Sequence, residues 1–287
     1  MTNFRKPPWL KKRIPPFQDL QKIKSILTET ELHTVCEEAR CPNLGECFSQ
    51  GTATILILGR ICTRDCGFCA VEHGSPVSPD EVEPHHVARA IKKMGLRYVV
   101  ITSVTRDDLL DGGASHFAKT IQAVREMDRE TKIEVLIPDF RGDRNSLHRV
   151  LQEGPDVLNH NMETVRRLYP EVRPQADYER SLDLLKRSKE TYPHIRTKSG
   201  FMLGLGESKE EILGLFEDLR RVRCDFLTIG QYLQPRANRL PVVRYVEPEE
   251  FEAYRKIGEE IGFKMVSSGP FVRSSFHASE MFNTSLL

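Results

Sequence analysis

Six of the seven cysteines in this 287-residue chain form two sets of three that lie close together in the sequence. The first triplet, with C-x4-C-x5-C spacing, consists of Cys36, Cys41 and Cys47. The second triplet, with C-x3-C-x2-C spacing, consists of Cys62, Cys66 and Cys69. A structural zinc site uses four protein ligands, and a cubane iron–sulfur cluster has four irons to ligate. Each triplet therefore predicts a metal centre with one position left for another ligand.

The bulk composition narrows the classes of protein to consider. A formal net charge of +1 gives no overall attraction to nucleic acid, and no apolar run approaches the ~18 residues of a membrane helix. The N-terminal stretch is basic but has no apolar core, so it is not a secretory signal. We expect a cytoplasmic protein that binds neither nucleic acid nor membrane. Its thiols stay reduced there, which favours metal binding over disulfides.

The elements that must position these cysteines follow an alternating pattern of strand and helix from residue 52 onward, after an N-terminal extension. Strands are expected at residues 53–59, 97–103, 132–138, 156–161, 195–203, 225–231 and 263–268. Helices are expected at residues 17–27, 84–94, 113–127, 146–151, 164–169, 178–192 and 248–261. One further helix should begin after Ser208, because Ser208 and Glu211 have the spacing of a capping box.

Alternating βα units predict a parallel sheet covered by helices. About six units fit this length, too few for a closed eight-stranded barrel, so we expect an open, partial (β/α)6 barrel. Working residues in such barrels lie where strands end. Polar or cysteine-containing segments fall at four predicted strand ends, at residues 62–69, 102–108, 161–163 and 204–207.

The C-x3-C-x2-C triplet directly after the first strand, with Phe68 before its last cysteine, resembles the signature of the radical S-adenosylmethionine (SAM) enzymes. The resemblance implies that Cys62, Cys66 and Cys69 hold a [4Fe–4S] cluster whose fourth iron takes SAM. The alternative interpretation of this triplet is a zinc knuckle or a ferredoxin-like electron carrier.

Further motifs narrow the resemblance to the lipoyl synthase family over nearly the whole chain. They include CTRDCGFC, YVVITSVTRDDLLDGGASHF, LNHNMETV, VRPQADYERSL, SGFMLGLGE, LTIGQYLQP and the terminal RSSF. The resemblance implies an auxiliary [4Fe–4S] cluster on the first triplet, with Ser275 as its fourth protein ligand. It divides the chain into an extension at 1–51, a radical SAM partial barrel at 52–268 and a C-terminal segment at 269–287.

The resemblance also assigns SAM-binding residues. Asn161 and Glu163 would bind the ribose hydroxyls, Arg173 the methionyl carboxylate, and Gly204 and Gly206 would let the backbone approach the adenine. Phe68 would pack near the cofactor. The alternative for each residue is local packing or capping. Cys62, Cys66, Cys69 and Ser275 are the expected catalytic set.

The implied reaction is insertion of sulfur at C6 and C8 of an octanoyl chain on a lysine of a lipoyl carrier domain, either a 2-oxoacid dehydrogenase E2 or a glycine cleavage H protein. Electrons would come from ferredoxin or flavodoxin, and an iron–sulfur carrier protein would repair the auxiliary cluster. The alternatives are a sulfur-inserting enzyme acting on dethiobiotin, or a metal-binding protein without catalysis.

Several residues stand apart from these assignments. Cys224 is expected to be a buried small side chain rather than a ligand. Phe276 stands where the family commonly has tyrosine, and Asn238-Arg239 where it usually has histidine. A basic arm surrounds Trp9, which suggests either a solvated tail or a docking site for an acidic carrier domain; its charged residues are Arg5, Lys6, Lys11, Lys12 and Arg13.

Overall fold

A computed structural model describes residues 6–11, 17–49 and 53–284. Its main sheet has eight strands in the order β1-β2-β5-β6-β7-β8-β9-β10. Every pairing is parallel except that of β1 with β2. The strands are β1 (His33–Thr34), β2 (Thr54–Ile57), β5 (Tyr98–Ser103), β6 (Lys132–Leu136), β7 (Val157–Asn159), β8 (Arg196–Leu203), β9 (Phe226–Gln231) and β10 (Met265–Gly269). A small separate sheet pairs β3 (Ile61–Cys62) with β4 (Glu72–His73).

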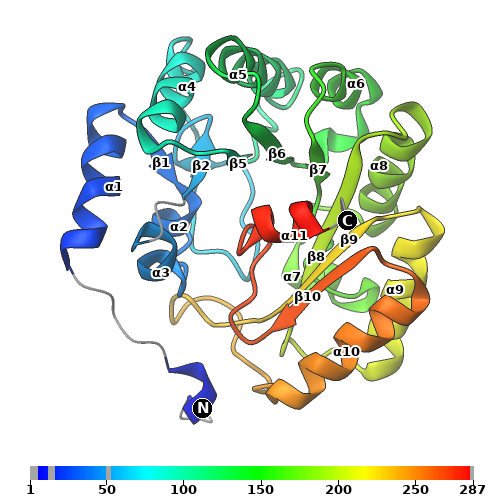
Figure 1. Ribbon diagram of the computed structural model, residues 1–287. Helices are drawn as coiled ribbons and strands as arrows, with labels where there is room; N and C mark the ends of the chain where they lie inside the picture. Colours follow the sequence, from blue (N-terminus) through cyan, green and yellow to red (C-terminus); the bar gives the residue numbers. More distant parts are fainter. Residues whose placement is uncertain (1–5, 12–16, 50–52, 285–287) are drawn as a thin grey trace.

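The long helices lie outside the sheet and follow six of its strands, as the pairs β2–α4, β5–α5, β6–α6, β7–α8, β8–α9 and β9–α10 (Figure 1). These helices are α4 (Glu83–Met94), α5 (Ala114–Met127), α6 (Arg144–Gln152), α8 (Tyr178–Thr191), α9 (Lys209–Arg221) and α10 (Pro248–Ile261). The helix α1 (Phe17–Glu29) precedes β1, and the shorter elements are η1 (Pro8–Leu10), α2 (Val35–Glu38), α3 (Leu44–Ser49), η2 (Phe140–Gly142), η3 (Arg166–Leu168), α7 (Tyr169–Val172) and α11 (Ala278–Thr284).

The six βα units confirm the partial barrel. No hydrogen-bonded pairing joins β1 to β10 in the described part of the chain, so the sheet is open. All four residues of β2 are buried, because helices cover one face and the interior of the barrel the other. The apolar stripe of α9 faces inward, and the capping box of Ser208 and Glu211 starts this helix as expected.

The predicted helix at 164–169 is wrong in its position. The structure instead has the 3₁₀ turn η3 followed by the single-turn helix α7, which begins at Tyr169. Pro170 explains the shift, because proline fits the first turn of a helix but not its interior. The two-residue strand β1 and helix α11 were not predicted.

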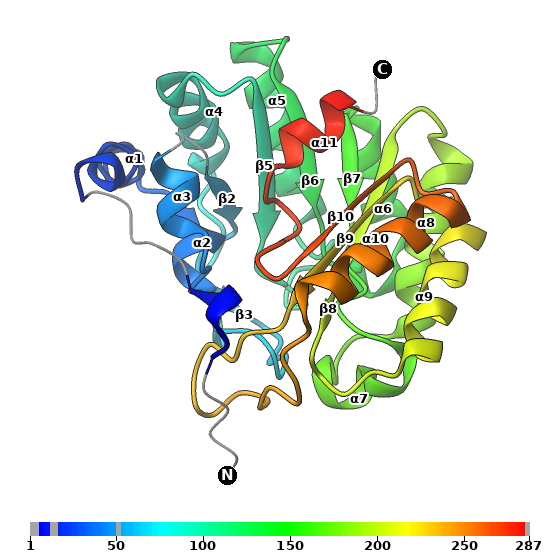
Figure 2. The ribbon, with the colours of Figure 1, turned by 60° about the horizontal axis from the view of Figure 1, so that its bottom comes forward.

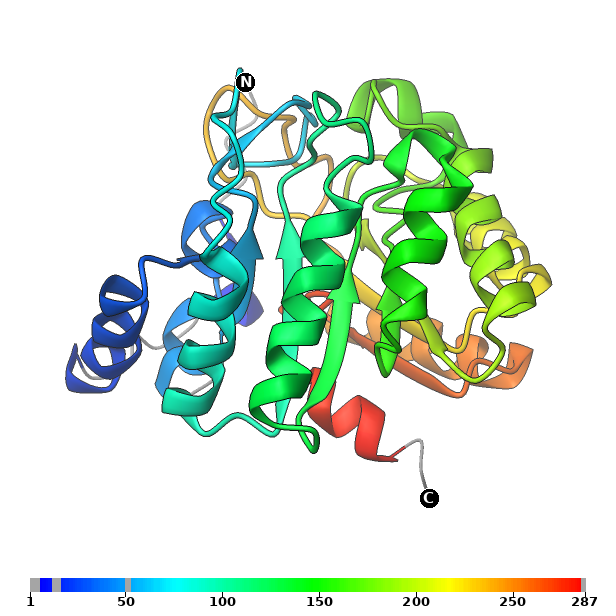
Figure 3. The same cartoon turned by 90° about the horizontal axis from the view of Figure 1, so that it is seen from above.

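Helix α11 closes one end of the barrel. Met281 and Phe282 are buried against Val157 and Phe226, which begin β7 and β9. The ring of Phe282 lies 5.7 Å from that of Tyr98, the first residue of β5. Figure 3 shows α11 at the end where the strands begin, opposite the loops into which they lead. The segment of residues 270–277 turns back from β10 toward α11 (Figure 2).

A buried ion pair joins β6 and β8. Lys198 on β8 donates to both oxygens of Glu134 on β6, at 3.0 and 3.1 Å. The same carboxylate accepts from Tyr98 and from Asn159. Because every charged atom has a partner, the pair is tolerated inside the barrel.

None of the helices within residues 6–11, 17–49 and 53–284 is long and apolar enough to cross a membrane.

Candidate active site

The second triplet lies on the loop after β2, at the end of the barrel opposite α11 (Figure 3). The sulfur of Cys62 accepts from the backbone N–H of Thr105 at 3.3 Å and of Arg64 at 3.4 Å. Thr63 binds the carbonyl of Thr105 through both its backbone N–H and its hydroxyl, each at 3.0 Å. The loop is therefore fixed to the segment that follows β5.

Arg64 holds the same loop through charge. Its guanidinium donates to both oxygens of Asp107, at 2.6 and 2.9 Å, and to Asp139 at 2.7 Å. Arg180 donates to the other oxygen of Asp139 at 2.9 Å. Burial by itself would raise the pKa of Asp139, but Arg64, together with the nearby His160 and Arg180, holds the pKa well below its usual range.

Residue 67 must be glycine for the loop to fit. A Cβ there would lie 2.9 Å from the Leu240 side chain and 3.0 Å from the carbonyl oxygen of Glu171. The Gly67 N–H donates to Val172, and its carbonyl accepts from Leu240. The loop of the second triplet is thus clamped between α7 and the segment after β9.

The donor set of the second triplet fits an iron–sulfur cluster. Burial raises the pKa of Cys66 to about 11, against the opposing effect of Arg173, and that of Cys69 to about 12. At neutral pH these two thiols lose their protons only when a metal centre takes the place of the protons. In the described residues, no three His, Cys, Asp or Glu side chains lie close enough to hold one metal ion. Each thiolate of a cubane binds a different iron, so a cubane does not require the three sulfurs to converge on one ion.

Asn161 and Glu163 lie side by side just after β7. The Asn161 amide nitrogen donates to Glu163 Oε1 at 2.9 Å. Glu163 has the left-handed φ of 66°, a conformation that costs about 1–2 kcal/mol in a residue other than glycine. Burial raises the pKa of Glu163, and Arg173 partly opposes this shift. Strain of this kind is retained where the surrounding structure fixes it, commonly at binding sites.

Arg173 points into the same interior from the end of α7. It donates to the backbone carbonyl oxygen of Asn161 at 2.8 Å and lies over the ring of Tyr169, 5.5 Å from its centroid. Its Nε is buried and has no hydrogen-bond partner among the described residues. Burial lowers the pKa of Arg173, but Tyr169, Glu163 and Cys66 outweigh it and raise the pKa overall. A fixed cation with a spare N–H is suited to a carboxylate ligand.

Gly204 and Gly206 follow β8 with left-handed φ values of 99° and 102°. A Cβ at Gly204 would lie 2.3 Å from Gln231 Nε2 and 2.5 Å from the carbonyl oxygen of Arg244. The Gly204 N–H donates to Glu207, and its carbonyl accepts from Val243. A Cβ at Gly206 would meet only Val243, at 3.7 Å, so the backbone there is the more open of the two.

The first triplet spans α2 and α3. Thr34 caps α2, which carries Cys36, and Cys47 lies on α3. Burial raises the pKa of Cys36 to about 11, with a further contribution from Cys41. At neutral pH the Cys36 thiol therefore loses its proton only when a metal centre takes the proton's place.

The 270–277 segment packs onto the loop of the first triplet on both sides of Ser275. The buried side chain of Asn43 donates to the Phe271 carbonyl at 2.7 Å, and His277 Nε2 lies 3.8 Å from Glu46. Arg273 lies within electrostatic reach of both Cys41 and Glu163. Residues more than 200 positions apart in the sequence thus meet at this site.

The two departures from the family pattern make different contacts. The ring of Phe276 packs edge-on against that of His277, with 4.1 Å between centroids. Arg239 forms an ion pair with Asp65 on the loop of the second triplet. Arg239 therefore supports the cysteine loop from the segment after β9.

Comparison with known proteins decides the family. The model of the radical SAM superfamily matches residues 56–219, and that of the N-terminal domain of lipoyl synthase matches residues 1–41. The lipoyl synthase of Rubrobacter xylanophilus is 57% identical over 275 residues, which cover 96% of this chain and 86% of that protein. That of Caldanaerobacter subterraneus subsp. tengcongensis is 56% identical and is covered to 96%.

The chain belongs to the lipoyl synthase family. As a member of this radical SAM family it is an enzyme that uses [4Fe–4S] clusters and SAM. A zinc protein or a passive electron carrier is no longer a competing interpretation. The crystal structure of HydG, a maturase of the [FeFe]-hydrogenase, has a TM-score of 0.58 and 15% identity, and covers 93% of this chain and 69% of that one. This likeness confirms the fold alone.

Several residues that shape the candidate site were not singled out from sequence, namely Arg64, Asp139, His160, Gln175 and Arg180. Gln175, for example, accepts from the backbone N–H of Asp65 at 2.8 Å. Their contacts are long-range, and the only signal was that most of them lie within the recognised motifs. Cys224 is fully buried, as expected. Of the basic arm, Lys6 and Lys11 are exposed, whereas Arg5, Lys12 and Arg13 lie outside the described residues, so carrier docking there stays a prediction.

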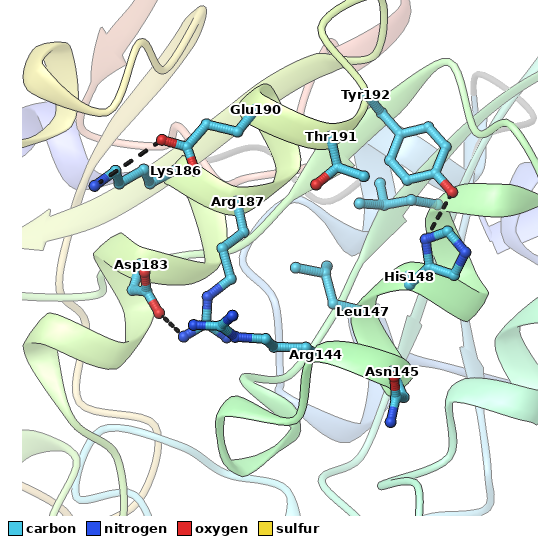
Figure 4. Close-up of a pocket in the computed structure, with 11 residues that line it drawn as sticks. Arg144, Asn145, Leu147, His148, Asp183, Lys186, Arg187, Glu190, Thr191 and Tyr192 are labelled. Atoms are coloured by element: carbon cyan, nitrogen blue, oxygen red, sulfur yellow. Dashed lines mark hydrogen bonds and ion pairs between the residues drawn. The ribbon is translucent and has the colours of Figure 1, made fainter.

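A separate cavity of about 440 Å³ lies between α6 and α8 on the outside of the barrel (Figure 4). Its lining includes Arg144, and Arg187 forms an ion pair with Asp183 there. Tyr192 and His148 share a hydrogen bond of 2.9 Å at its other side. No residue of either cysteine triplet lines this cavity, so it is not part of the candidate active site.

Proposed function

We propose that this chain is a lipoyl synthase that inserts two sulfur atoms, at C6 and C8, into an octanoyl chain carried on a lysine of a lipoyl carrier domain. The observation that carries the proposal is the position of the 270–277 segment. It contacts Asn43 in the loop of the first triplet and Asn161 in the predicted SAM site. A single segment thus joins the two sites that sulfur insertion requires.

Cys62, Cys66 and Cys69 would hold the radical cluster, and Cys36, Cys41, Cys47 and Ser275 the auxiliary cluster. When bound, the first cluster supplies the electron that cleaves SAM to a 5′-deoxyadenosyl radical, and the second supplies sulfur. The backbone N–H groups of Thr105 and Arg64 at Cys62 are placed to stabilise charge on its sulfur. Phe68, half-buried on the same loop, would pack near SAM.

The chain's own polar groups would orient SAM. Asn161 and Glu163 would bind the ribose hydroxyls, and the Arg173 guanidinium, with its unpartnered Nε, would bind the methionyl carboxylate. Gly206 would give the adenine room to approach the backbone. Gly204 would hold the loop in shape, because its own N–H and carbonyl are already paired within the protein.

Ser275 would be the replaceable ligand of the auxiliary cluster. A hydroxyl is a harder and less acidic ligand than a thiol, so it binds iron less firmly. A cluster that gives up sulfur benefits from one weakly held corner. The contacts of Phe271 and His277 on either side would keep Ser275 at the first triplet.

The partners follow from the reaction. The substrate carrier would be the lipoyl domain of a 2-oxoacid dehydrogenase E2 or a glycine cleavage H protein. Ferredoxin or flavodoxin would supply electrons, and an iron–sulfur carrier protein would restore the auxiliary cluster. We place the enzyme in the cytoplasm, without nucleic-acid or membrane partners.

The test is to incubate the anaerobically reconstituted enzyme with an octanoylated lysine peptide, SAM and a reductant. The expected product carries two added sulfur atoms by mass spectrometry, with about two molecules of 5′-deoxyadenosine formed per product. Deoxyadenosine without any sulfur-containing product would contradict the proposed reaction but leave the family's radical chemistry in place.

A further inference from the structure

The amide of Asn161 is held in one orientation by two acceptors. One N–H of its nitrogen donates to Glu163 Oε1 at 2.9 Å, and the other donates to the hydroxyl oxygen of Ser274 at 2.6 Å. With both donors engaged, the carbonyl oxygen Oδ1 is fixed on the opposite side of the amide. This oxygen is buried and has no partner among the described residues. It is therefore presented as an acceptor for a ligand hydroxyl.

Ser274 reaches Asn161 because two glycines leave room for the 270–277 segment against the inner face of the sheet. A Cβ at Gly230 would lie 2.1 Å from the Val272 carbonyl oxygen. A Cβ at Gly200 would lie 2.3 Å from Thr228 Oγ1, and 3.1 and 3.3 Å from Asn161 Oδ1 and Ser274 Oγ. The contact between Ser274 and Asn161 thus depends on the segment lying directly on β8 and β9.

The same segment is held at its other side by the first triplet. Asn43 donates to the carbonyl of Phe271, which lies three residues before Ser274. Ser275 is the residue directly after Ser274. Two neighbouring serines therefore serve two different sites. Ser274 contacts the SAM site, and Ser275 is the proposed ligand of the auxiliary cluster.

We propose that Ser274 is a positioning residue that fixes the Asn161 amide with its carbonyl toward the SAM ribose, so that SAM binds tightly only when the 270–277 segment is seated in the barrel. This inference rests on the proposed function, in which Asn161 and Glu163 bind the ribose. Without the Ser274 hydroxyl only Glu163 holds the amide, and its side-chain carbonyl is less firmly fixed in the direction that the ribose hydroxyl needs.

The coupling must work in both directions. If a seated segment raises the affinity for SAM, then SAM must stabilise the seated segment by the same factor. Loss of Ser275 from the auxiliary centre would loosen Ser274 as well, because the two residues are adjacent. Events at the sulfur-donating centre would thereby be transmitted to the SAM site.

The first measurement is the equilibrium dissociation constant for SAM of the reconstituted protein. Ser274→Ala should weaken binding roughly three- to tenfold, the effect of losing one orienting hydrogen bond. Ser274→Thr keeps the hydroxyl and should bind SAM nearly as the wild type does. Ser268→Ala is the matched control, because Ser268 donates to the Phe251 carbonyl and not to the site. Asn161→Ala tests the ribose role itself.

The second measurement is amide hydrogen exchange of residues 270–277 with and without SAM. SAM should slow exchange in the wild type and in Ser274→Thr, and this protection should be lost in Ser274→Ala. A purely structural role of Ser274 would raise exchange equally with and without SAM.

The outcomes separate the two levels of the proposal. If Asn161→Ala weakens SAM binding but Ser274→Ala does not, the coupling is wrong and the ribose role stands. If neither variant weakens it, the ribose assignment fails as well. If Ser274→Ala does not fold, wild-type exchange decides, because absence of protection by SAM there overturns the coupling.

Discussion

Arg64 and Asp139 form an ion pair of 2.7 Å in which neither side chain is more than 4% exposed. It joins the loop of the second triplet to the end of β6, across the segment that follows β5. Asp107 and Arg180 complete the network, so Arg64 and Asp139 each have two charged partners. Such a network fixes a cysteine loop in place before any cluster arrives.

Arg64→Ala should destabilise the protein by about 3–5 kcal/mol, because it leaves the buried carboxylate of Asp139 without its main partner. Arg64→Lys should lie between wild type and alanine, since lysine keeps the charge but not the fork that binds Asp107. Denaturant unfolding and iron content after reconstitution measure the effect. Arg60→Ala is the control, because Arg60 is exposed and its ion pair with Glu38 is long, at 3.9 Å. Equal stability of the Arg60 and Arg64 alanine variants would refute the role of the network.

Gly200→Ala should lower both stability and SAM affinity. The added methyl group would lie 2.3 Å from Thr228 Oγ1 and would press on Asn161 and Ser274. Overpacking of this kind typically costs about 1–3 kcal/mol. Gly214→Ala on α9 is the matched change, because no atom lies within 4 Å of its Cβ position and alanine favours a helix by about 1 kcal/mol. Thermal unfolding should shift in opposite directions for the two variants.

The buried, neutral ring of His160 should make the protein less stable in mild acid. Burial lowers its pKa to about 4, so the folded protein keeps the ring neutral, whereas the unfolded chain binds the proton near the ordinary pKa of 6.5. Between these values the unfolded state holds more protons, and stability falls as the pH is lowered. The contribution of His160 at pH 5 should be about 2 kcal/mol relative to pH 7.

The measurement is the unfolding free energy at pH 7 and at pH 5, for the wild type and for His160→Gln. The variant should lose less stability than the wild type over this interval. His194→Gln, at an exposed position, should follow the wild type. Parallel curves for all three proteins would mean that His160 does not resist protonation.

The two cysteine triplets should have different functions that substitutions can distinguish. The reconstituted wild type should hold about eight irons and eight sulfides, since each cubane has about four of each. Replacing Cys62, Cys66 and Cys69 by alanine should abolish SAM cleavage, whereas replacing Cys36, Cys41 and Cys47 should leave some cleavage but stop sulfur transfer. Lipoyl product from the latter variant would exclude the auxiliary cluster as the sulfur source.

Ser275→Ala should lose product while keeping the radical cluster. Ser275→Cys should hold the auxiliary cluster more firmly and donate sulfur poorly, because thiolate is the softer ligand for iron. Iron content and product mass together distinguish the two results. Turnover at the wild-type rate in both variants would move the ligand assignment to another residue.

The order of strands and helices could be predicted because each long element carries its own period and end signals. Pro84 and Gly95 marked the limits of α4, and Ser208 marked the start of α9. Strand β1 has only two residues, too few for any periodicity, and its antiparallel pairing depends on β2 being present. Helix α11 is a single short stretch whose apolar residues acquire meaning only against the strand ends that it covers.

The cysteines of the candidate site could be found because their spacing is local and specific. The contacts that arrange the site could not. Arg64 reaches Asp139 across 75 positions, and Asn161 reaches Ser274 across 113. Such pairs leave no local pattern, since either partner alone fits an ordinary polar loop. The open carbonyl of Asn161 is visible only when both of its donors can be traced.

The hydrogen bond between the Asn43 side chain and the Phe271 carbonyl closes a loop of 228 positions, most of the 287-residue chain. Closing so long a loop is slow, because its entropy must be lost before the contact contributes. During synthesis the residues around Asn43 leave the ribosome early and those around Phe271 very late, so every strand from β2 to β10 emerges between them. The final residues therefore act as a completion step, and a chain truncated before residue 270 would have all eight strands of the sheet without a finished site.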